Sequence, residues 1–195
     1  MGPLSSIGED VTIGAETALW AGMHDHGLVR IGARVTIHSG TVIGSDGFGF
    51  ERTESGERER CAHIAGAVIK DDVEIGANAD IDRGTLGNTR VCAGAKIANL
   101  AHIRHNVPVG ARALVIANVT ICGGTQIGEE TWIAPSACLR DGIRIGDRAS
   151  VGLGSVVTKD VEDGSVVFGV PARPADKGKL HLTCLDELVT QRSRD

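Results

Sequence analysis

The sequence predicts an all-β protein, a parallel β-helix built from stacked three-sided coils, on the strength of three observations. Aliphatic residues recur every six positions over most of the chain. Glycine is abundant, at 27 of 195 residues, whereas aromatic residues make up only 3%. A core with so few rings must be filled by Val, Ile, Leu and Ala in repeated positions. Because neither a helix nor a simple alternating strand gives a stripe at a period of six, we expect short strands joined by tight corners.

The longest uninterrupted part of the repeat covers 91–157. An earlier run covers 7–43, where Asp25 alone departs from the pattern, and a short third run covers 69–81. Three hexapeptides form one coil, and each coil stacks on the previous one through parallel hydrogen bonds, with one aliphatic side chain per side pointing inward. The count predicts about seven to eight coils. The twelve aliphatic positions of the longest run are Val91, Ile97, Ile103, Val109, Val115, Ile121, Ile127, Ile133, Leu139, Ile145, Val151 and Val157.

Two further positions of the hexapeptide are also patterned. Glycine often follows the aliphatic residue directly, as at Gly8 and Gly110, and we expect these glycines to form the corners. A small or β-branched residue often stands two positions before the next aliphatic residue, as at Val35, Ala95 and Thr125. We expect this second residue to pack inward beside the aliphatic one.

Two interruptions of the repeat must leave the prism as loops. The first, at 45–62, is too polar for the interior, and the second, at 82–90, reads DRGTLGNTR. Past Val157 the pattern fades, and spaced leucines near the C-terminus predict a short helix that caps the last coil. We therefore divide the chain into a β-helix domain, 1–165, with loop 45–62 protruding, and a C-terminal extension, 166–195.

Composition excludes several classes of function. The net charge of -5 and the lack of tyrosine disfavour a nucleic-acid partner. No apolar run is long enough to span a membrane and the first residues do not form a signal peptide, so we expect a cytoplasmic protein. The five cysteines are widely spaced, without a CxxC pair, which favours buried thiols in a reducing compartment over disulfides or a zinc site. We expect no metal.

Specific motifs resemble the acyltransferases of lipid A biosynthesis. These motifs are IGSDGFGF at 43–50 and, further on, the segment IDRGTLGNTRVCAGAKIANLAHIRHNVPVGARALVIANVTICGG. The first motif resembles the UDP-3-O-acylglucosamine N-acyltransferase family in particular, and the resemblance covers roughly 43–157. It implies that the β-helix is left-handed. Since the repeat already begins at Ile7, we expect the uridine-binding domain of that family to be missing here and nucleotide recognition to differ.

The resemblance implies that His105 is a general base. An imidazole with a pKa near 6.5 suits removal of a proton from an amine or hydroxyl as it attacks a thioester. The family reaction proceeds directly in a ternary complex, without an acyl-enzyme. Gly123 matches the family glycine whose backbone N–H stabilises the oxyanion. It follows His105 by 18 residues, which in this fold is one full coil along the same side.

The resemblance also suggests residues for acceptor recognition or for orienting the base. A family carboxylate is replaced by Ala98, and a second family histidine by glycine, at Gly124 or near Gly142. We therefore expect the base to be oriented differently here. The matching positions are Asp82, Arg83, Asn99, His102 and Asn106.

The C-terminal part resembles hexapeptide acetyltransferases that use acetyl-CoA, with GVPAR near the pantetheine and nucleotide. Acyl-CoA is therefore favoured as the donor, with an acyl carrier protein as the alternative. Lys159 and Arg173 are candidates for binding the CoA phosphates, whereas a row formed by Arg140, Arg144 and Arg148 would suit an acidic carrier protein. The family rule is a homotrimer, with the cleft between neighbouring prisms.

We expect an acyltransferase that moves an acyl group from a thioester to the amine of an amino sugar or sugar nucleotide. One alternative is an O-acetyltransferase acting on a sugar or small alcohol. Another is a metal enzyme resembling γ-class carbonic anhydrase, for which His63, His102 and His105 are the only plausible ligands. A third is a non-catalytic scaffold.

Overall fold

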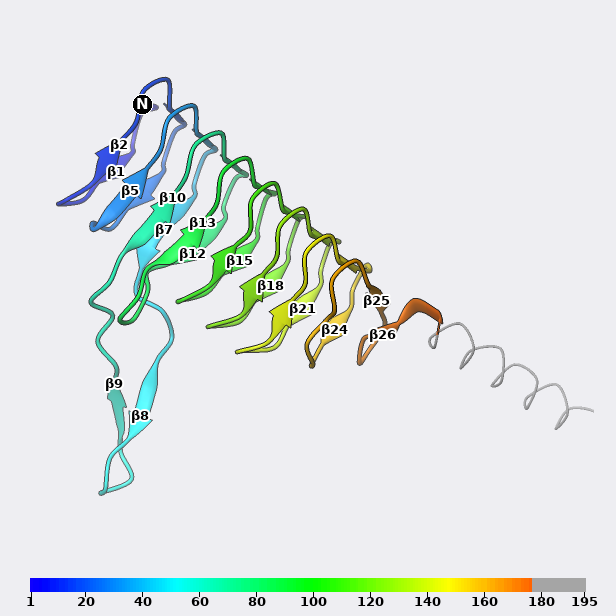
Figure 1. Cartoon of the computed structure of the whole chain (residues 1–195). Coiled ribbons are helices and arrows are strands. Elements are labelled where there is room, and N and C mark those ends of the chain that lie inside the picture. Colours follow the sequence, from blue (N-terminus) through cyan, green and yellow to red (C-terminus); the bar gives the residue numbers. More distant parts are fainter. Residues whose placement is uncertain (177–195) are drawn as a thin grey trace, which may run out of the picture.

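The computed structural model describes residues 1–176, and these residues stack into a three-sided parallel β-helix (Figure 1). This confirms the all-β, left-handed β-helix expected from the sequence. The C-terminal helix predicted from the sequence would lie in 177–195, outside the described residues. Within 1–176, no helix has the length and apolar character needed to cross a membrane.

Each side of the prism is one sheet of very short strands, paired with the equivalent strands one coil before and after. Sheet A has eight parallel strands, so the prism has about eight coils. They are β1 (Ser6–Ile7), β4 (His24–Asp25), β7 (Val42–Ser45), β12 (Asp80–Asp82), β15 (His102–Ile103), β18 (Thr120–Ile121), β21 (Cys138–Leu139) and β24 (Val156–Val157). Sheet B consists of β2 (Thr12–Ile13), β5 (Val29–Ile31), β10 (Ala67–Ile69), β13 (Thr89–Val91), β16 (Pro108–Val109), β19 (Gln126–Ile127) and β22 (Arg144–Ile145).

Sheet C forms the third side. It consists of β3 (Ala18–Leu19), β6 (Thr36–Ile37), β11 (Glu74–Ile75), β14 (Lys96–Ile97), β17 (Leu114–Val115), β20 (Trp132–Ile133), β23 (Ser150–Val151), β25 (Val166–Phe168) and β26 (Arg173–Pro174). All of its pairs are parallel except the last, in which β26 runs antiparallel to β25. Strand β25 pairs with β23, so the parallel stacking extends to residue 168.

The inward ladder follows the six-residue period. In sheet A, Ile81 pairs with Ile103, which pairs with Ile121, and all three side chains are fully buried. The second patterned position also packs inward, since Ala95 and Thr125 are fully buried. The ladder therefore fixes the register, because a shift by one residue would turn the aliphatic face to solvent.

Apart from Gly44, the glycines directly after the aliphatic residues do not adopt the left-handed conformation of the corners, contrary to our expectation. The left-handed backbone conformation recurs instead three positions after the aliphatic residue, as at Asn106, Arg112 and Asn118. Glycines such as Gly110 have ordinary φ values but face the next coil closely, since a Cβ there would collide with the Gly128 carbonyl group. Close approach of adjacent coils, rather than turn geometry, thus selects these glycines.

Both interruptions of the repeat leave the prism, as expected. The first forms an antiparallel hairpin of β8 (Phe50–Arg52) and β9 (Arg58–Arg60), which projects from one side of the stack (Figure 1). The second, between β12 and β13, is a short loop. Strands β7 and β12 pair directly despite the 37 residues that separate Ser45 from Asp82, so the coil closes across the base of the hairpin.

Asp25 occupies an inward position of the ladder in place of an aliphatic residue. Its side chain lies between Ile7 and Ile43 in sheet A, and the residue is only 3% exposed. Neither carboxyl oxygen has a hydrogen-bond partner among the described residues. Burial raises the pKa of Asp25 to about 7, because a charged carboxylate is disfavoured in an apolar interior.

Candidate active site

His105 and Gly123 meet on the edge between sheets A and B. They lie on consecutive coils, joined by the Gly124 N–H, which donates to the His105 carbonyl at 3.0 Å. A Cβ on Gly123 would lie 2.5 Å from Cε1 and 2.7 Å from Nε2 of the His105 ring. The imidazole therefore lies directly against Gly123, and only glycine leaves room for it. The Gly123 N–H itself has no backbone acceptor within the part of the chain that the structure describes.

The surroundings of His105 favour its neutral form. Burial lowers the pKa of His105, the neighbouring His63 and Arg104 lower it further, and Asp82 opposes them. The ring is therefore unprotonated at neutral pH and available as a base. Its Nδ1 is buried without a hydrogen-bond partner among residues 1–176, so none of the described carboxylates orients this ring through Nδ1. Ala98, where the family carboxylate was expected, lies beside Asn99 on the edge between sheets C and A, so this position does not face the His105 ring within the described residues.

The segment that leads into the hairpin covers His105. A Cβ on Gly47 would lie 2.7 Å from Cδ2 of His105 and 2.7 Å from Nε2 of His63. The His63 and His105 rings meet edge to face, with centroids 5.2 Å apart and planes at 72°. From the sequence, His63 is a candidate only for a metal ligand. The repeat does not mark it, because His63 lies in the loop between β9 and β10 and strand β7 pairs directly with β12.

His102 belongs to a separate polar cluster on sheet A, next to this edge. Its Nε2 lies 3.6 Å from Asp82 and 3.8 Å from Asp80. The Ser45 hydroxyl donates to Asp80 at 2.8 Å and to Asp82 at 3.3 Å. The Asp82 carboxylate raises the pKa of His102, against the effect of burial. The strongly buried Asp82 is thus the centre of a hydrogen-bonding cluster beside His105.

The three histidines expected for a carbonic-anhydrase-like site do not form one cluster within the chain. His63 contacts His105, whereas His102 faces Asp80 and Asp82. These last three are the one group among the described residues whose potential ligand atoms all lie within 4.8 Å of one another. The donor set of that group is hard and acidic, unlike the three imidazoles of such a zinc site.

Arg83 and Asn106 hold the loop between β12 and β13. The Arg83 Nε donates to the Ala65 carbonyl at 2.8 Å, and its guanidinium lies 4.0 Å from Asp46. The Asn106 Oδ1 accepts from the Thr85 N–H at 2.6 Å. Both residues therefore shape the surroundings of His105 through the backbone.

Asn99 is not brought to His105. It lies on the edge between sheets C and A, beside a hollow of about 300 Å³ that His38, Glu74 and Lys96 also line. Its Oδ1 accepts from the Ala77 N–H at 2.8 Å. The separation follows from the repeat, because a residue six positions before His105 occupies a different edge of the triangle.

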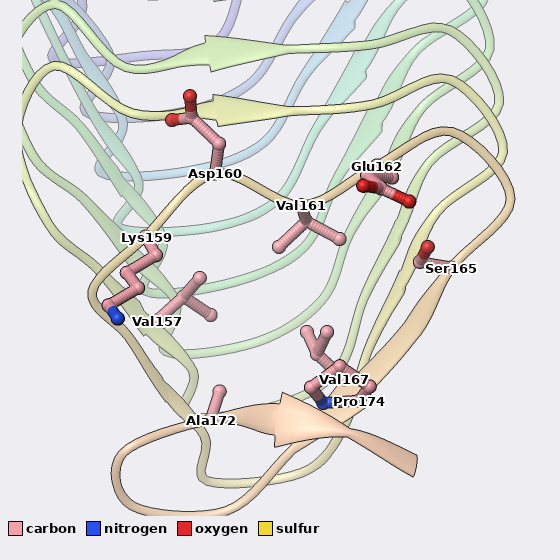
Figure 2. Close-up of a pocket in the computed structure, with 9 residues that line it drawn as sticks. All are labelled: Val157, Lys159, Asp160, Val161, Glu162, Ser165, Val167, Ala172 and Pro174. Carbon is pink, nitrogen blue, oxygen red and sulfur yellow. The ribbon is translucent and has the colours of Figure 1, made fainter. Parts of the chain in front are cut away.

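Lys159 lies on the same edge as His105, three coils further along the prism. At about 4.8 Å per coil this is about 14 Å away. It borders a cavity of about 340 Å³ at the end of the prism, into which Val157, Val161 and Val167 point (Figure 2). Lining residues also include Asp160 and Glu162, so the cavity is not purely basic. Arg173, in β26, is exposed and does not line it.

Comparison with known proteins gives the same likeness as the motifs. The chain is 40% identical to UDP-3-O-acylglucosamine N-acyltransferase of Wolinella succinogenes over 142 residues. The matched part is 73% of this chain and 45% of that protein. The enzyme of the same name from Hahella chejuensis is 43% identical over 141 residues, covering 72% and 40%. The chain resembles these N-acyltransferases. The resemblance expected from the sequence is thereby confirmed.

The N-acyltransferase likeness covers only part of those relatives, since the chain spans less than half the length of either. No family model matches the chain. Solved structures agree on the fold. A Francisella novicida UDP-N-acetylglucosamine acyltransferase superposes with a TM-score of 0.82 at 24% identity, over 90% of this chain and 63% of that one. The Moraxella catarrhalis UDP-N-acetylglucosamine O-acyltransferase gives 0.62 at 26% identity, over 87% and 66%.

Proposed function

We propose that this chain is an acyltransferase that moves an acyl group from a thioester to the amine of an amino sugar carried by a nucleotide. The observation that carries the proposal is the contact between His105 and Gly123. A neutral imidazole lies against a glycine whose N–H has no backbone acceptor within residues 1–176, beneath the hairpin. The relatives that share the surrounding motifs act, by name, on UDP-3-O-acylglucosamine.

The geometry supports a direct transfer with His105 as the base. The acceptor amine attacks the thioester carbonyl, forming a C–N bond, while His105 takes the proton that the nitrogen loses. The Gly123 N–H donates to the oxygen of the tetrahedral intermediate. The C–S bond then breaks, and the proton on His105 passes to the departing thiolate. The products are an amide and a free thiol.

The acceptor is held, in this proposal, on the hairpin side of His105. The cluster of Asp82 and His102 offers hydrogen-bonding groups there, and Arg83 and Asn106 fix the loop that borders it. Asn99 serves the fold, since its side chain is used by the backbone of the preceding coil.

Acyl-CoA is the donor that we favour, with an acyl carrier protein as the alternative. Lys159 supports CoA, because it lies on the same edge as His105, about 14 Å further along the prism. An extended pantetheine arm with its thioester at His105 would bring the CoA phosphates toward this lysine. Arg173 is the second candidate for a phosphate. The row of Arg140, Arg144 and Arg148 would suit an acidic carrier protein. Its positive charge is partly neutralised at Arg144, whose guanidinium donates to Asp163 at 2.9 Å. The assembly that we propose is a homotrimer.

The test is a measurement of thiol release from acyl-CoA and from acyl carrier protein, each with and without UDP-3-O-acylglucosamine. The proposal predicts thiol release that requires the acceptor and equals amide formation. Faster release with acyl-CoA would select CoA as the donor. Absence of turnover with both donors, in a protein shown by light scattering to be a folded trimer, would overturn the proposed activity.

A further inference from the structure

His63 has an unused hydrogen-bonding atom at the site of His105. The residue is 6% exposed, and its Nδ1 lies 3.0 Å from the Cys61 carbonyl oxygen. Because a carbonyl only accepts hydrogen bonds, Nδ1 carries the proton and Nε2 keeps a lone pair in the neutral ring. That Nε2 is buried with no partner among the described residues. A buried acceptor without a partner is unfavourable and calls for a ligand or a functional role.

The lone pair of His63 faces the same space as the His105 ring. The Gly47 position lies between them, as its close approach to both rings shows. A Cβ on Gly49 would likewise lie 3.2 Å from Cε1 of His63. The short segment 47–49 therefore covers both imidazoles, and it has one glycine on each side of Phe48.

The cover is held by one backbone hydrogen bond, from the Cys61 N–H to the Gly49 carbonyl at 3.0 Å, by the contact of Arg83 with Asp46, and by two contacts at the surface. Arg60 lies 3.6 Å from Asp46, with about half of each side chain exposed. Arg104 donates to the Phe48 carbonyl at 3.1 Å, also at the surface. The exposed ion pair contributes little to stability, so a ligand that displaces the segment has mainly the backbone hydrogen bond at Gly49 and the contact at Asp46 to replace. A polar group entering there meets His105 on one side and His63 on the other.

We propose that His63 is a specificity-determining residue that selects an amine over a hydroxyl as the acceptor, by accepting a hydrogen bond from the nucleophile at Nε2. The inference rests on the proposed function. A primary amine has two N–H groups, so it can give one proton to His105 and donate the other to His63. A hydroxyl has a single proton, and once that proton is directed to His105 nothing remains for His63. The hydrogen bond to His63 also fixes the direction of the amine lone pair.

The test compares two acceptors, UDP-3-O-acylglucosamine and the analogue with a hydroxyl in place of its amine. His63→Phe keeps an aromatic ring against His105 but removes the acceptor atom, whereas His63→Gln can return an oxygen near the position of Nε2. For His63→Phe we expect kcat/KM with the amine to fall by about 10-fold, as for loss of one hydrogen bond, and kcat/KM with the hydroxyl to stay unchanged. His63→Gln should recover most of the amine rate.

His38→Phe is the matched control, because His38 also stacks on an aromatic ring, Trp20, on a different side of the prism. It should leave both rates as in the wild type. Equal losses on both acceptors in His63→Phe, or no loss on either, would overturn the role of His63 alone. Failure of the wild-type protein to acylate either acceptor would instead overturn the proposed function and this inference with it.

Discussion

The uninterrupted repeat at 91–157 and the interrupted part at 43–91 have the same backbone plan but different uses. In the first, every coil buries an aliphatic residue on each side, and one edge carries His105 and Gly123. In the second, the chain leaves the prism twice and returns with His63, Asp82 and the cover over His105. The repeat therefore places His105 and Gly123 one coil apart, while the interruptions supply the groups that surround them.

The first way to test this contrast is removal of the proposed base. We expect His105→Ala to lower kcat by about 10²- to 10⁴-fold, the usual contribution of a general base. The ring lies outside the ladder, so the melting temperature and the assembly state should stay as in the wild type. Activity within a few-fold of the wild type would remove His105 from this role.

A substitution in the ladder of the uninterrupted repeat should have the opposite effect, a loss of stability without a loss of kcat. Ile133 is fully buried in sheet C, away from the edge of His105. We expect Ile133→Ala to lower the free energy of unfolding by about 2–5 kcal/mol through the cavity that it leaves. The kcat of the folded fraction should change little. Denaturant unfolding together with assays at low temperature would show this, and a large loss of kcat without loss of stability would contradict the division.

Asp25 is an exception within a ladder run, and its effect should depend on pH. The folded state raises the pKa of Asp25 to about 7 from 3.8, so between these values the folded protein binds more protons than the unfolded one. Stability therefore falls as pH rises through this window. Asp25→Val should remove that dependence and raise stability at pH 8 by on the order of 2 kcal/mol.

Melting temperatures of Asp25→Val and the wild type, compared at pH 5 and pH 8, would check this. The difference between the two proteins should be larger at pH 8. An equal difference at both values would mean that the Asp25 carboxyl ionises normally in the folded protein.

The smallest effect is expected on the edge between sheets C and A. Asn99→Ala removes an acceptor from the Ala77 N–H, so it should destabilise the protein by about 1 kcal/mol. Its kcat/KM should remain within about two-fold of the wild type, because Asn99 does not reach His105. A loss of kcat/KM well beyond that in kinetic assays would place Asn99 in the acceptor site, as the family resemblance suggested.

The sequence was sufficient for the ladder and for the pair His105 and Gly123, because a strict period of six converts directly into sides, edges and coils. The same period separates Asn99 from His105, since six residues lead from one edge of the prism to the next. Glycine in the sequence suggests a turn, but at Gly110 it permits close approach of the next coil, so glycine alone does not locate the corners. The contact of His63 with His105 could not be predicted from the six-residue period, since it depends on how the chain returns from the hairpin to the prism.

The central claim is that His105 and the Gly123 N–H act on one thioester. The most direct test is a crystal structure of the protein with a non-hydrolysable acyl-thioester analogue and the amine acceptor. The account predicts the analogue's carbonyl oxygen about 2.7–3.1 Å from the Gly123 nitrogen, with the acceptor nitrogen within hydrogen-bonding reach of His105. A carbonyl held elsewhere on the prism, with His105 and Gly123 contacting neither substrate, would contradict it.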